Sequence, residues 1–279
     1  MNLKIMNYNI LHGFHSDNQP FVLQEDRLKS AQEVVKRENP DILILTEACF
    51  ADKNKYGIKM NYKKLFSFPH YFHTITGNEW NSALLSKYPI NSSQDYCMDR
   101  RMFFRNELDV DGNKIYLDVA HPHPDLSEFE RKRFFHSYLR DIPDKSYILT
   151  GDFNAISDQD KYYREKLIKG FLGFIKNKEV VDKVVDERLT HQAISEIRRH
   201  NLIDTYRKIN KGVQQYTIPT DYLSLDKSSG MRVDYIFCSP DFEVEDARVI
   251  KNELTEKASD HYPVIAQLKL KISKTKNRK

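Results

Sequence analysis

Apolar and polar side chains alternate along the first residues of the chain, with the two-residue period of a β-strand. Residues 2–10 follow this period, so we expect a strand there. Over residues 25–38 the period becomes helical, because apolar side chains recur three or four positions apart, and Pro40 then interrupts the pattern. The apolar run Ile42–Leu45 predicts a buried strand over residues 41–46.

Later segments repeat these patterns without a linker or a change of composition between them. Strands are predicted near 70–76, 82–87, 146–151, 231–239, 244–251 and 262–270, and a hairpin over 100–120 that turns at Asp111-Gly112-Asn113. A helix is predicted over 127–141, and two or three helices over 158–206. This mixture favours an α/β fold, a four-layered sandwich in which two mixed β-sheets pack face to face with helices outside.

The composition predicts a soluble protein with a substantial core. Of the 279 residues, 40% are hydrophobic and 30% are charged, as in ordinary globular domains. The longest apolar runs resemble that at 42–45, far short of the roughly 20 residues that span a bilayer, so we expect no membrane insertion. Cys49, Cys97 and Cys238 form no Cys-x-x-Cys motif, which favours a reducing, cytoplasmic location. We also expect a monomer.

The net charge of +4 originates at the end of the chain. Six of the 44 Lys and Arg residues lie in 269–279, which holds no acid, so the remaining residues carry 38 basic and 40 acidic groups. A basic excess confined to a tail is weak support for a nucleic-acid partner. Residues 272–279 form what we call the basic C-terminal tail.

Polar side chains stand at the boundaries of the predicted strands, and one of them, Asp234, lies within the apolar segment 233–237. They are Asn9, Glu47, His121, Asp152, Asn154, Asp234 and the pair Asp260-His261. Buried acids are costly unless they are paired or bind a metal, and α/β sheets build active sites from residues at strand ends. A turn or a cap explains any one of these residues, but the whole set indicates an active site.

The same positions belong to short motifs that occur in a fixed order. The motifs are 4–13 (KIMNYNILHG), 40–47 (PDILILTE), 83–90 (ALLSKYPI), 119–121 (VAH), 151–154 (GDFN), 232–237 (RVDYIF) and 259–264 (SDHYPV). In this set and order, the chain resembles the endonuclease/exonuclease/phosphatase superfamily, the DNase I-like metal-dependent phosphoesterases. The resemblance implies one domain over 1–271, with a helical insert at about 156–200, where no motif matches.

Phosphodiester hydrolysis needs an activated water, neutralisation of charge on the phosphoryl oxygens and help for the leaving oxygen. Glu47 is predicted to bind Mg²⁺, with Mn²⁺ as a substitute, because these ions prefer carboxylate oxygens. The resemblance implies Asp260 as the partner of Glu47, and Asn9 as a metal ligand or a donor to the phosphate. Asp152 is the predicted base, and Asn154, two residues further on, is predicted to hold water or phosphate.

Two histidines complete the predicted catalytic set. His261 follows Asp260 directly, and we expect Asp234 to accept one ring N–H of His261, which fixes the tautomer and raises the pKa of the imidazole. The charged ring would then stabilise the pentacoordinate phosphate. His121 is predicted to contact the phosphate or to assist the leaving oxygen.

Two other groups of residues were weighed against this site. His121-Pro122-His123, with His12 and His15, has the spacing of some zinc hydrolases, but the prolines at 122 and 124 break a strand and the acids favour Mg²⁺. Tyr62-Lys63-Lys64 and Arg131-Lys132-Arg133 are candidate phosphate-facing patches. We expect both to be solvated helix faces.

The leading prediction is a Mg²⁺-dependent phosphodiesterase, a nuclease acting on DNA or RNA. Phosphoinositides or small phosphorylated metabolites are the alternative substrates, because motifs of this kind do not choose the substrate. An abasic-site nuclease is disfavoured, since the single Trp80 does not follow Tyr216-Thr217, where that branch carries a tryptophan. A non-catalytic binding module with the same fold is also disfavoured, because every catalytic carboxylate and histidine is present.

Overall fold

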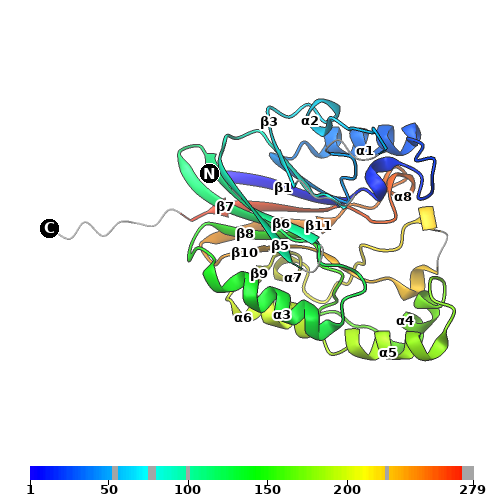
Figure 1. Cartoon of the computed structure of the whole chain (residues 1–279). Helices are drawn as coiled ribbons and strands as arrows, with labels where there is room; N and C mark the ends of the chain where they lie inside the picture. Colours follow the sequence, from blue (N-terminus) through cyan, green and yellow to red (C-terminus); the bar gives the residue numbers. More distant parts are fainter. Residues whose placement is uncertain (52–55, 75–79, 99–100, 224–225, 272–279) are drawn as a thin grey trace.

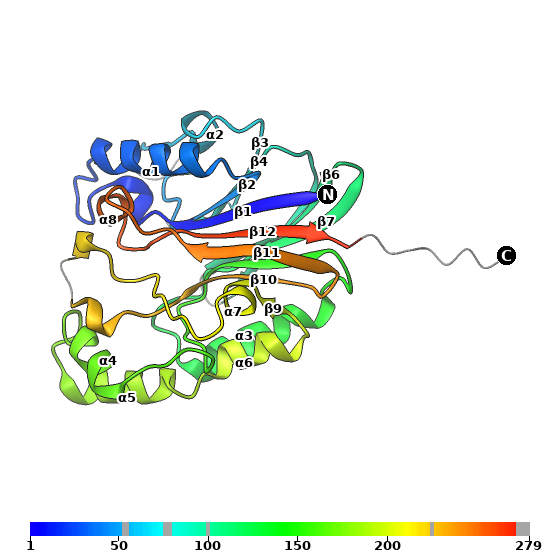
Figure 2. The same cartoon turned by 180° about the vertical axis from the view of Figure 1, so that it is seen from behind.

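A computed structural model describes residues 1–51, 56–74, 80–98, 101–223 and 226–271. The basic C-terminal tail lies outside these residues. Two six-stranded sheets pack face to face, and helices cover both outer faces (Figure 1; Figure 2). This arrangement confirms the expected α/β sandwich.

The first sheet has the strand order β11-β12-β1-β2-β4-β3. Its strands are β1 (Asn2–Asn9), β2 (Ile42–Thr46), β3 (His70–His73), β4 (Ala83–Ser86), β11 (Phe242–Val249) and β12 (Val264–Leu270). β1 runs parallel to β2 and antiparallel to β12. The first and last strands of the domain are therefore neighbours in the middle of this sheet.

The second sheet has the strand order β5-β6-β7-β8-β10-β9. Its strands are β5 (Ile90–Met98), β6 (Arg101–Val110), β7 (Asn113–Val119), β8 (Tyr147–Asp152), β9 (Ile203–Asp204) and β10 (Asp234–Cys238). β7 and β8 are parallel, and the other neighbours are antiparallel. The sequence patterns located the hairpin of β6 and β7 but not the edge strand β5 or the two-residue β9.

Alternate residues of β1 explain how the layers hold together. Leu3 and Ile5 point between the sheets, where they are fully buried with Leu117 and Ile148 of the second sheet. Met6 and Tyr8, with the opposite parity, are buried against the helices outside the first sheet. Burying each of the larger apolar side chains contributes about 1.5–3 kcal/mol.

Helices form the two outer layers. α1 (Glu25–Glu38), α2 (Tyr62–Leu65) and α8 (Thr255–Ala258) lie outside the first sheet, and α3 (Glu128–Tyr138) and α6 (Gln192–Arg199) lie outside the second. α7 (Thr205–Ile209) packs beside β11 and β10. In the part of the chain that the structure describes, no helix is long and apolar enough to cross a membrane.

The predicted boundaries of the helices follow from local chemistry. α1 occupies the predicted span and ends at Glu38. The next residue, Asn39, caps the helix with a left-handed φ of 46° and is followed by Pro40. α3 begins with a capping box, in which Ser127 and Glu130 exchange hydrogen bonds between side chain and backbone. α3 ends at Tyr138 and a 3₁₀ turn continues to Asp141, so the predicted span of 127–141 is helical in two pieces.

Helices also fill much of 156–200, the proposed insert. α4 (Arg164–Phe171) and α5 (Lys178–Arg188) share a small core of their own with Met231 and Val233. α6 instead joins the layer over the second sheet, beside α3. Figures 1 and 2 place α4 and α5, together with α8, at the end of the sandwich opposite the N-terminus. The division of the chain into a domain and an insert stays a prediction.

Candidate active site

Strand direction brings polar residues of the first sheet to one edge. Asn9 is the last residue of β1 and pairs with Thr46, the last residue of the parallel strand β2, so Glu47 follows directly beside it. β12 is antiparallel to β1, with Val264 opposite Asn7. Asp260 and His261, which precede β12, therefore arrive at the same edge.

The second sheet delivers its polar residues to the same end of the sandwich. Asp152 ends β8 and pairs with Asp234, the first residue of the antiparallel strand β10. β7 is parallel to β8 and ends at Val119, so His121 lies just beyond this edge. The pairing of β8 with β10 thus places Asp152 and Asp234, and the pairing of β7 with β8 places His121.

Asn9 connects the two sheets through its amide group. Its Nδ2 donates to Oε1 of Glu47 and to Oδ2 of Asp152, both at 3.1 Å. The backbone N–H of Leu11 donates to Oδ1 of Asn9 at 3.1 Å, which fixes the orientation of the amide. Because Asn9 is fully buried, these bonds hold Glu47 and Asp152 at a defined separation.

The Oδ2 atom of Asp152 lies at the centre of the cluster. Besides Asn9, it faces Nε2 of His121 at 3.5 Å and Nε2 of His261 at 3.8 Å. The other carboxylate oxygen of Asp152, Oδ1, accepts from the backbone N–H of Asn154 at 2.9 Å. Burial and the neighbouring Asp234 raise the pKa of Asp152 to about 7, although the charge of His261 acts in the opposite direction.

Asp234 orients His261. Nδ1 of His261 and Oδ2 of Asp234 are 2.7 Å apart, in a buried pair. Burial alone would lower the pKa of His261, but Asp234, Asp260 and Asp152 together raise it well above its usual value. Asn7, which the sequence patterns did not single out, donates from Nδ2 to the other oxygen of Asp234 at 3.4 Å. The ring is therefore held in one orientation and in the charged form.

The acids at this edge have the chemistry of a site for a hard cation. Burial raises the pKa of the Asp260 carboxyl, and the like charge of Glu47 adds to the effect. One atom each of Asp152, Asp234 and His261 also lie within 4.8 Å of one another, but Asp234 and His261 already hydrogen-bond each other. The carboxylate oxygens of Glu47, Asp260 and Asp152 suit Mg²⁺, which prefers oxygen ligands.

Two buried arginines lie behind the site, and neither was predicted there. Arg188 of α5 donates to the backbone carbonyl of Asn154 and, at 3.4 Å, to that of Pro124. Arg131 of α3 donates to Pro124 at 2.5 Å and is only 1% exposed. The prediction that Arg131 lies on a solvated helix face is therefore wrong, because it packs beneath the loop that carries His121.

Contacts to both its side chain and its backbone carbonyl hold Asn154 in place. Its own backbone has a left-handed φ of 48°, and its Nδ2 donates to the carbonyl of Pro122 at 3.1 Å. With Arg188 on its carbonyl, Asn154 is fixed beside Asp152. Its side chain thus ties the turn after β8 to the loop that carries His121.

The histidines of the alternative zinc group make local contacts instead. Nδ1 of His15 lies 3.0 Å from the carbonyl of Gly13. The backbone N–H of Asp125 donates to Nδ1 of His123 at 3.2 Å. His12 packs its ring against Trp80. The three rings thus make contacts of their own, whereas Nε2 of His121 faces Asp152 at 3.5 Å.

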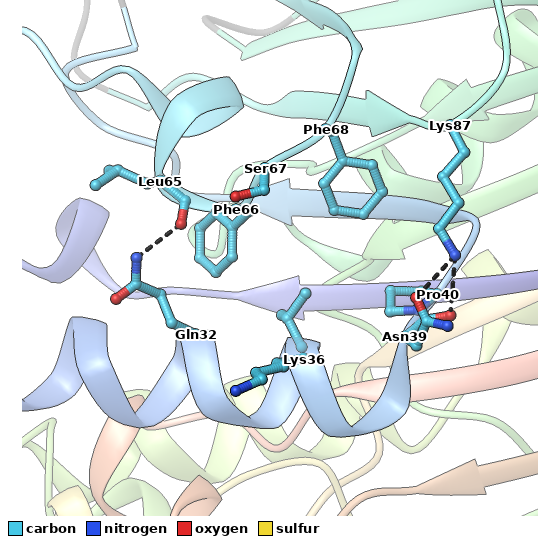
Figure 3. Close-up of a pocket in the computed structure, with 10 residues that line it drawn as sticks. Gln32, Lys36, Asn39, Pro40, Leu65, Phe66, Ser67, Phe68 and Lys87 are labelled. Atoms are coloured by element: carbon cyan, nitrogen blue, oxygen red, sulfur yellow. Dashed lines mark hydrogen bonds between the residues drawn. The ribbon is translucent and has the colours of Figure 1, made fainter.

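A surface hollow of about 350 Å³ lies elsewhere, between α1 and residues 65–68 (Figure 3). Gln32 donates across it to the carbonyl of Leu65 at 2.7 Å. Nζ of Lys87 is held by Asn39 at 2.9 Å. Because Asn39 and Pro40 precede β2 whereas Glu47 follows it, this hollow is at the other end of the strand from the carboxylates and takes no part in their chemistry.

The comparisons with known proteins agree with this geometry. The sequence model of the Endonuclease/Exonuclease/phosphatase family matches residues 6–261, a span that includes every predicted site residue. No curated protein sequence matches the chain significantly.

Solved structures with the same fold cover nearly the whole chain. An AP endonuclease from Archaeoglobus fulgidus is 20% identical, with a TM-score of 0.67 over 95% of this chain and 98% of its own. An endonuclease/exonuclease/phosphatase from Bacteroides vulgatus is 16% identical, with a TM-score of 0.68 over 97% and 100%. A humanized D. rerio TDP2 is 17% identical, with a TM-score of 0.63 over 96% and 99%.

At these identities the solved structures show a common fold, and the match over residues 6–261 shows the ancestry. The ordered motifs, the two packed sheets and the cluster around Asp152 fit that result. The chain belongs to the endonuclease/exonuclease/phosphatase family.

Proposed function

We propose that the chain is a Mg²⁺-dependent phosphodiesterase that cleaves nucleic acid. The observation that supports this most directly is the position of Asp152 Oδ2, which faces one amide and two imidazoles at 3.1–3.8 Å. The donors hold the Asp152 carboxylate in a fixed orientation, and its burial makes it a better proton acceptor than an exposed aspartate.

Asp152 acts as the general base in this proposal. Because the pKa of its carboxyl is raised to about 7, it accepts a proton more readily than an ordinary aspartate and is still ionised in weak alkali. The N–H of Asn154 holds one carboxylate oxygen, so Oδ2 remains directed at the water. The side chain of Asn154 would hold that water or a phosphate oxygen.

The histidines bind and stabilise the phosphate. His261 carries a positive charge that Asp234 holds in place, and preorganised charge of this kind stabilises the oxygens of the transition state. His121 would contact the phosphate or support the leaving oxygen. The amide of Asn9 donates to Glu47 and Asp152 and accepts from Leu11, so Asn9 would position these two carboxylates, and contact with a phosphate would need one of its donors to change partner.

Glu47 and Asp260 would hold the metal, with Mn²⁺ as a substitute for Mg²⁺. Their carboxylates lie at the same edge, and the charge of Glu47 contributes to the raised pKa of Asp260. A bound divalent cation neutralises charge on the phosphoryl oxygens of such substrates. A bound cation would offset the repulsion between the carboxylates of Glu47 and Asp260, and this relief would favour its binding.

Nucleic acid is the substrate that we favour, with small phosphorylated molecules or phosphoinositides as the second candidate. The 16 Tyr and 16 Phe residues and the basic C-terminal tail offer base stacking and phosphate contacts, which supports nucleic acid. The 38 basic and 40 acidic residues outside 269–279 support the second candidate, since a nuclease body is commonly basic. A monomer in the cytoplasm completes the proposal. None of the three cysteines is in a disulfide in the described part of the chain, which is consistent with that compartment.

The test is a panel of substrates in the presence of Mg²⁺. Plasmid DNA, single-stranded RNA, a chromogenic phosphodiester and inositol phosphates are incubated with the wild-type protein and with Asp152→Asn, with EDTA as a further control. We expect cleavage of nucleic acid by the wild type alone. Hydrolysis of inositol phosphates without cleavage of nucleic acid would favour the second candidate, and no hydrolysis by any preparation would refute the phosphoesterase.

A further inference from the structure

The segment that follows β1 has an uncommon backbone. Leu11, His12 and Phe14 have φ values of 37°, 50° and 68°, in the left-handed region that side chains other than glycine rarely adopt. Gly13 lies between them, and a Cβ there would come within 2.6 Å of the carbonyl oxygen of Cys49. Strained backbone of this kind persists where the surroundings impose it, and it occurs preferentially at functional sites.

Arg27 imposes this conformation. Its guanidinium donates to the carbonyls of Ile10 and Leu11, both at 3.0 Å, and to that of His15 at 3.2 Å. Arg27 is 4% exposed, so these bonds form in a buried environment where they are strong. The backbone on both sides of His12 is therefore fixed.

The fixed backbone places His12 next to Glu47. The N–H of His12 donates to Oε2 of Glu47 at 3.3 Å. Its ring packs against that of Trp80, with centroids 4.7 Å apart and planes inclined by 59°. The carbonyl of Asn81 accepts from the N–H of Ala48 at 2.8 Å, which ties the Trp80 loop to the turn that carries Glu47. Both rings are partly exposed.

We propose that His12 and Trp80 form a stacking platform for a nucleobase of the substrate, next to the phosphodiester that is cleaved. The proposal rests on the phosphodiesterase function given above and specifies its substrate class. Stacking suits this place because an aromatic face accepts any base, whereas the phosphate is bound by the charged cluster. The catalytic residues recognise only the phosphate, so discrimination between a nucleotide and another phosphodiester requires a second contact of this kind.

Trp80 is the single tryptophan of the chain, so its fluorescence reports contact directly. The Asp152→Asn protein, which is expected to bind without cleaving, is titrated with a thymidine dinucleotide and with the same dinucleotide lacking both bases. We expect quenching by the first and about tenfold weaker binding of the second, as the loss of base stacking predicts. Equal titration curves, or no change of fluorescence with either compound, would overturn the platform.

Kinetics on the same two compounds separate a binding role from a structural one. Trp80→Leu and His12→Ala should each lower kcat/KM for the dinucleotide while leaving that for the base-free compound unchanged. Phe129→Leu removes an aromatic ring that is 57% exposed on α3 and serves as the matched control. If Trp80→Leu and His12→Ala lower kcat/KM equally for the dinucleotide and for the base-free compound, the rings have a structural role only and the platform is refuted. If the wild type cleaves both compounds at equal rates, the platform is refuted but the phosphodiesterase stands.

Discussion

Replacing Asp152 by Asn is expected to stabilise the metal-free protein above pH 7, although the same change should remove most of its catalysis. Asp152 is 2% exposed, and burial together with Asp234 raises its pKa from 3.8 to about 7. A carboxyl whose pKa is higher in the folded than in the unfolded state binds protons more tightly when folded. Its contribution to the free energy of unfolding therefore falls as the pH rises from about 4 to about 7.

Two opposing effects set the magnitude. A pKa difference of about three units corresponds to about 4 kcal/mol of destabilisation by the charged carboxylate above pH 7, which Asn does not suffer. Against this, the new Nδ2 would face the Nδ2 of Asn9, where the wild type has a 3.1 Å hydrogen bond. A lost buried hydrogen bond costs about 1–3 kcal/mol. The balance is a stabilisation of about 1–3 kcal/mol, or about 5 °C in Tm for a chain of this size.

Thermal unfolding followed by circular dichroism in EDTA, at pH values from 4.5 to 8.5, measures this effect. We expect Asp152→Asn to be no more stable than the wild type at pH 4.5, where both side chains are neutral, and clearly more stable at pH 8. Asp17→Asn, at an exposed position, is the control and should show no such trend. A difference in Tm that does not change with pH, or a less stable variant at pH 8, would refute the assignment of a raised pKa.

Three further changes test the other roles. Glu47→Gln should lose activity that rising Mg²⁺ concentrations largely restore, as a metal titration of the rate would show; full activity of the wild type after exhaustive EDTA treatment would contradict any metal role. Asp234→Asn and His261→Ala should each lower kcat by about 10²–10⁴-fold, and the double variant should be no worse than either, whereas multiplying losses would indicate independent roles. Arg188→Met should lower kcat by up to about 10²-fold through misplacement of Asn154, with KM little changed and partial rescue by Arg188→Lys; an unchanged kcat would show that the arginine only supports the fold.

Elements with a strong period were predictable from the sequence. β1 and α1 appear where the two-residue and helical periods place them, because each buries one face against a layer of the sandwich. The candidate site was predictable for a different reason. Its residues interrupt apolar strands with polar groups at the strand ends, and the pairing of β1 with β2 and of β8 with β10 then brings them together.

β5 was not predictable from the sequence, because its position in the sheet removes the need for alternating apolar and polar side chains. It forms the edge of the second sheet, and residues 91–95 are exposed. A strand whose middle residues are exposed needs no apolar alternation there, so polar residues fill 91–95 and only Ile90 and Tyr96, near the ends, pack against the cores. The register also shifts between Ile90 and Ser92, which breaks any remaining two-residue pattern.

Supporting residues of the site were missed because tertiary structure alone decides their environment. Asn7 has the ordinary position of a strand residue, and only the packing of the two sheets sets it against Asp234. Its buried amide bonds one carboxylate oxygen of Asp234 and so helps to hold the Asp234–His261 pair in place. No local pattern in the sequence distinguishes such an amide from one on a solvated face.

The two buried arginines show how charge in the site is balanced. Burial lowers the pKa of Arg131, and it lowers that of Arg188 to about 9, so the Arg188 guanidinium stays charged at neutral pH. Glu128 lies 3.5 Å from Arg131 and offsets one of these charges. One positive charge therefore remains behind the carboxylates and attracts Asp152, which favours its ionised form. The basic run at 131–133 thus places Arg131 in the interior beside Glu128, and the cation that faces Asp152 from behind is Arg188 of α5, which no basic run marks in the sequence.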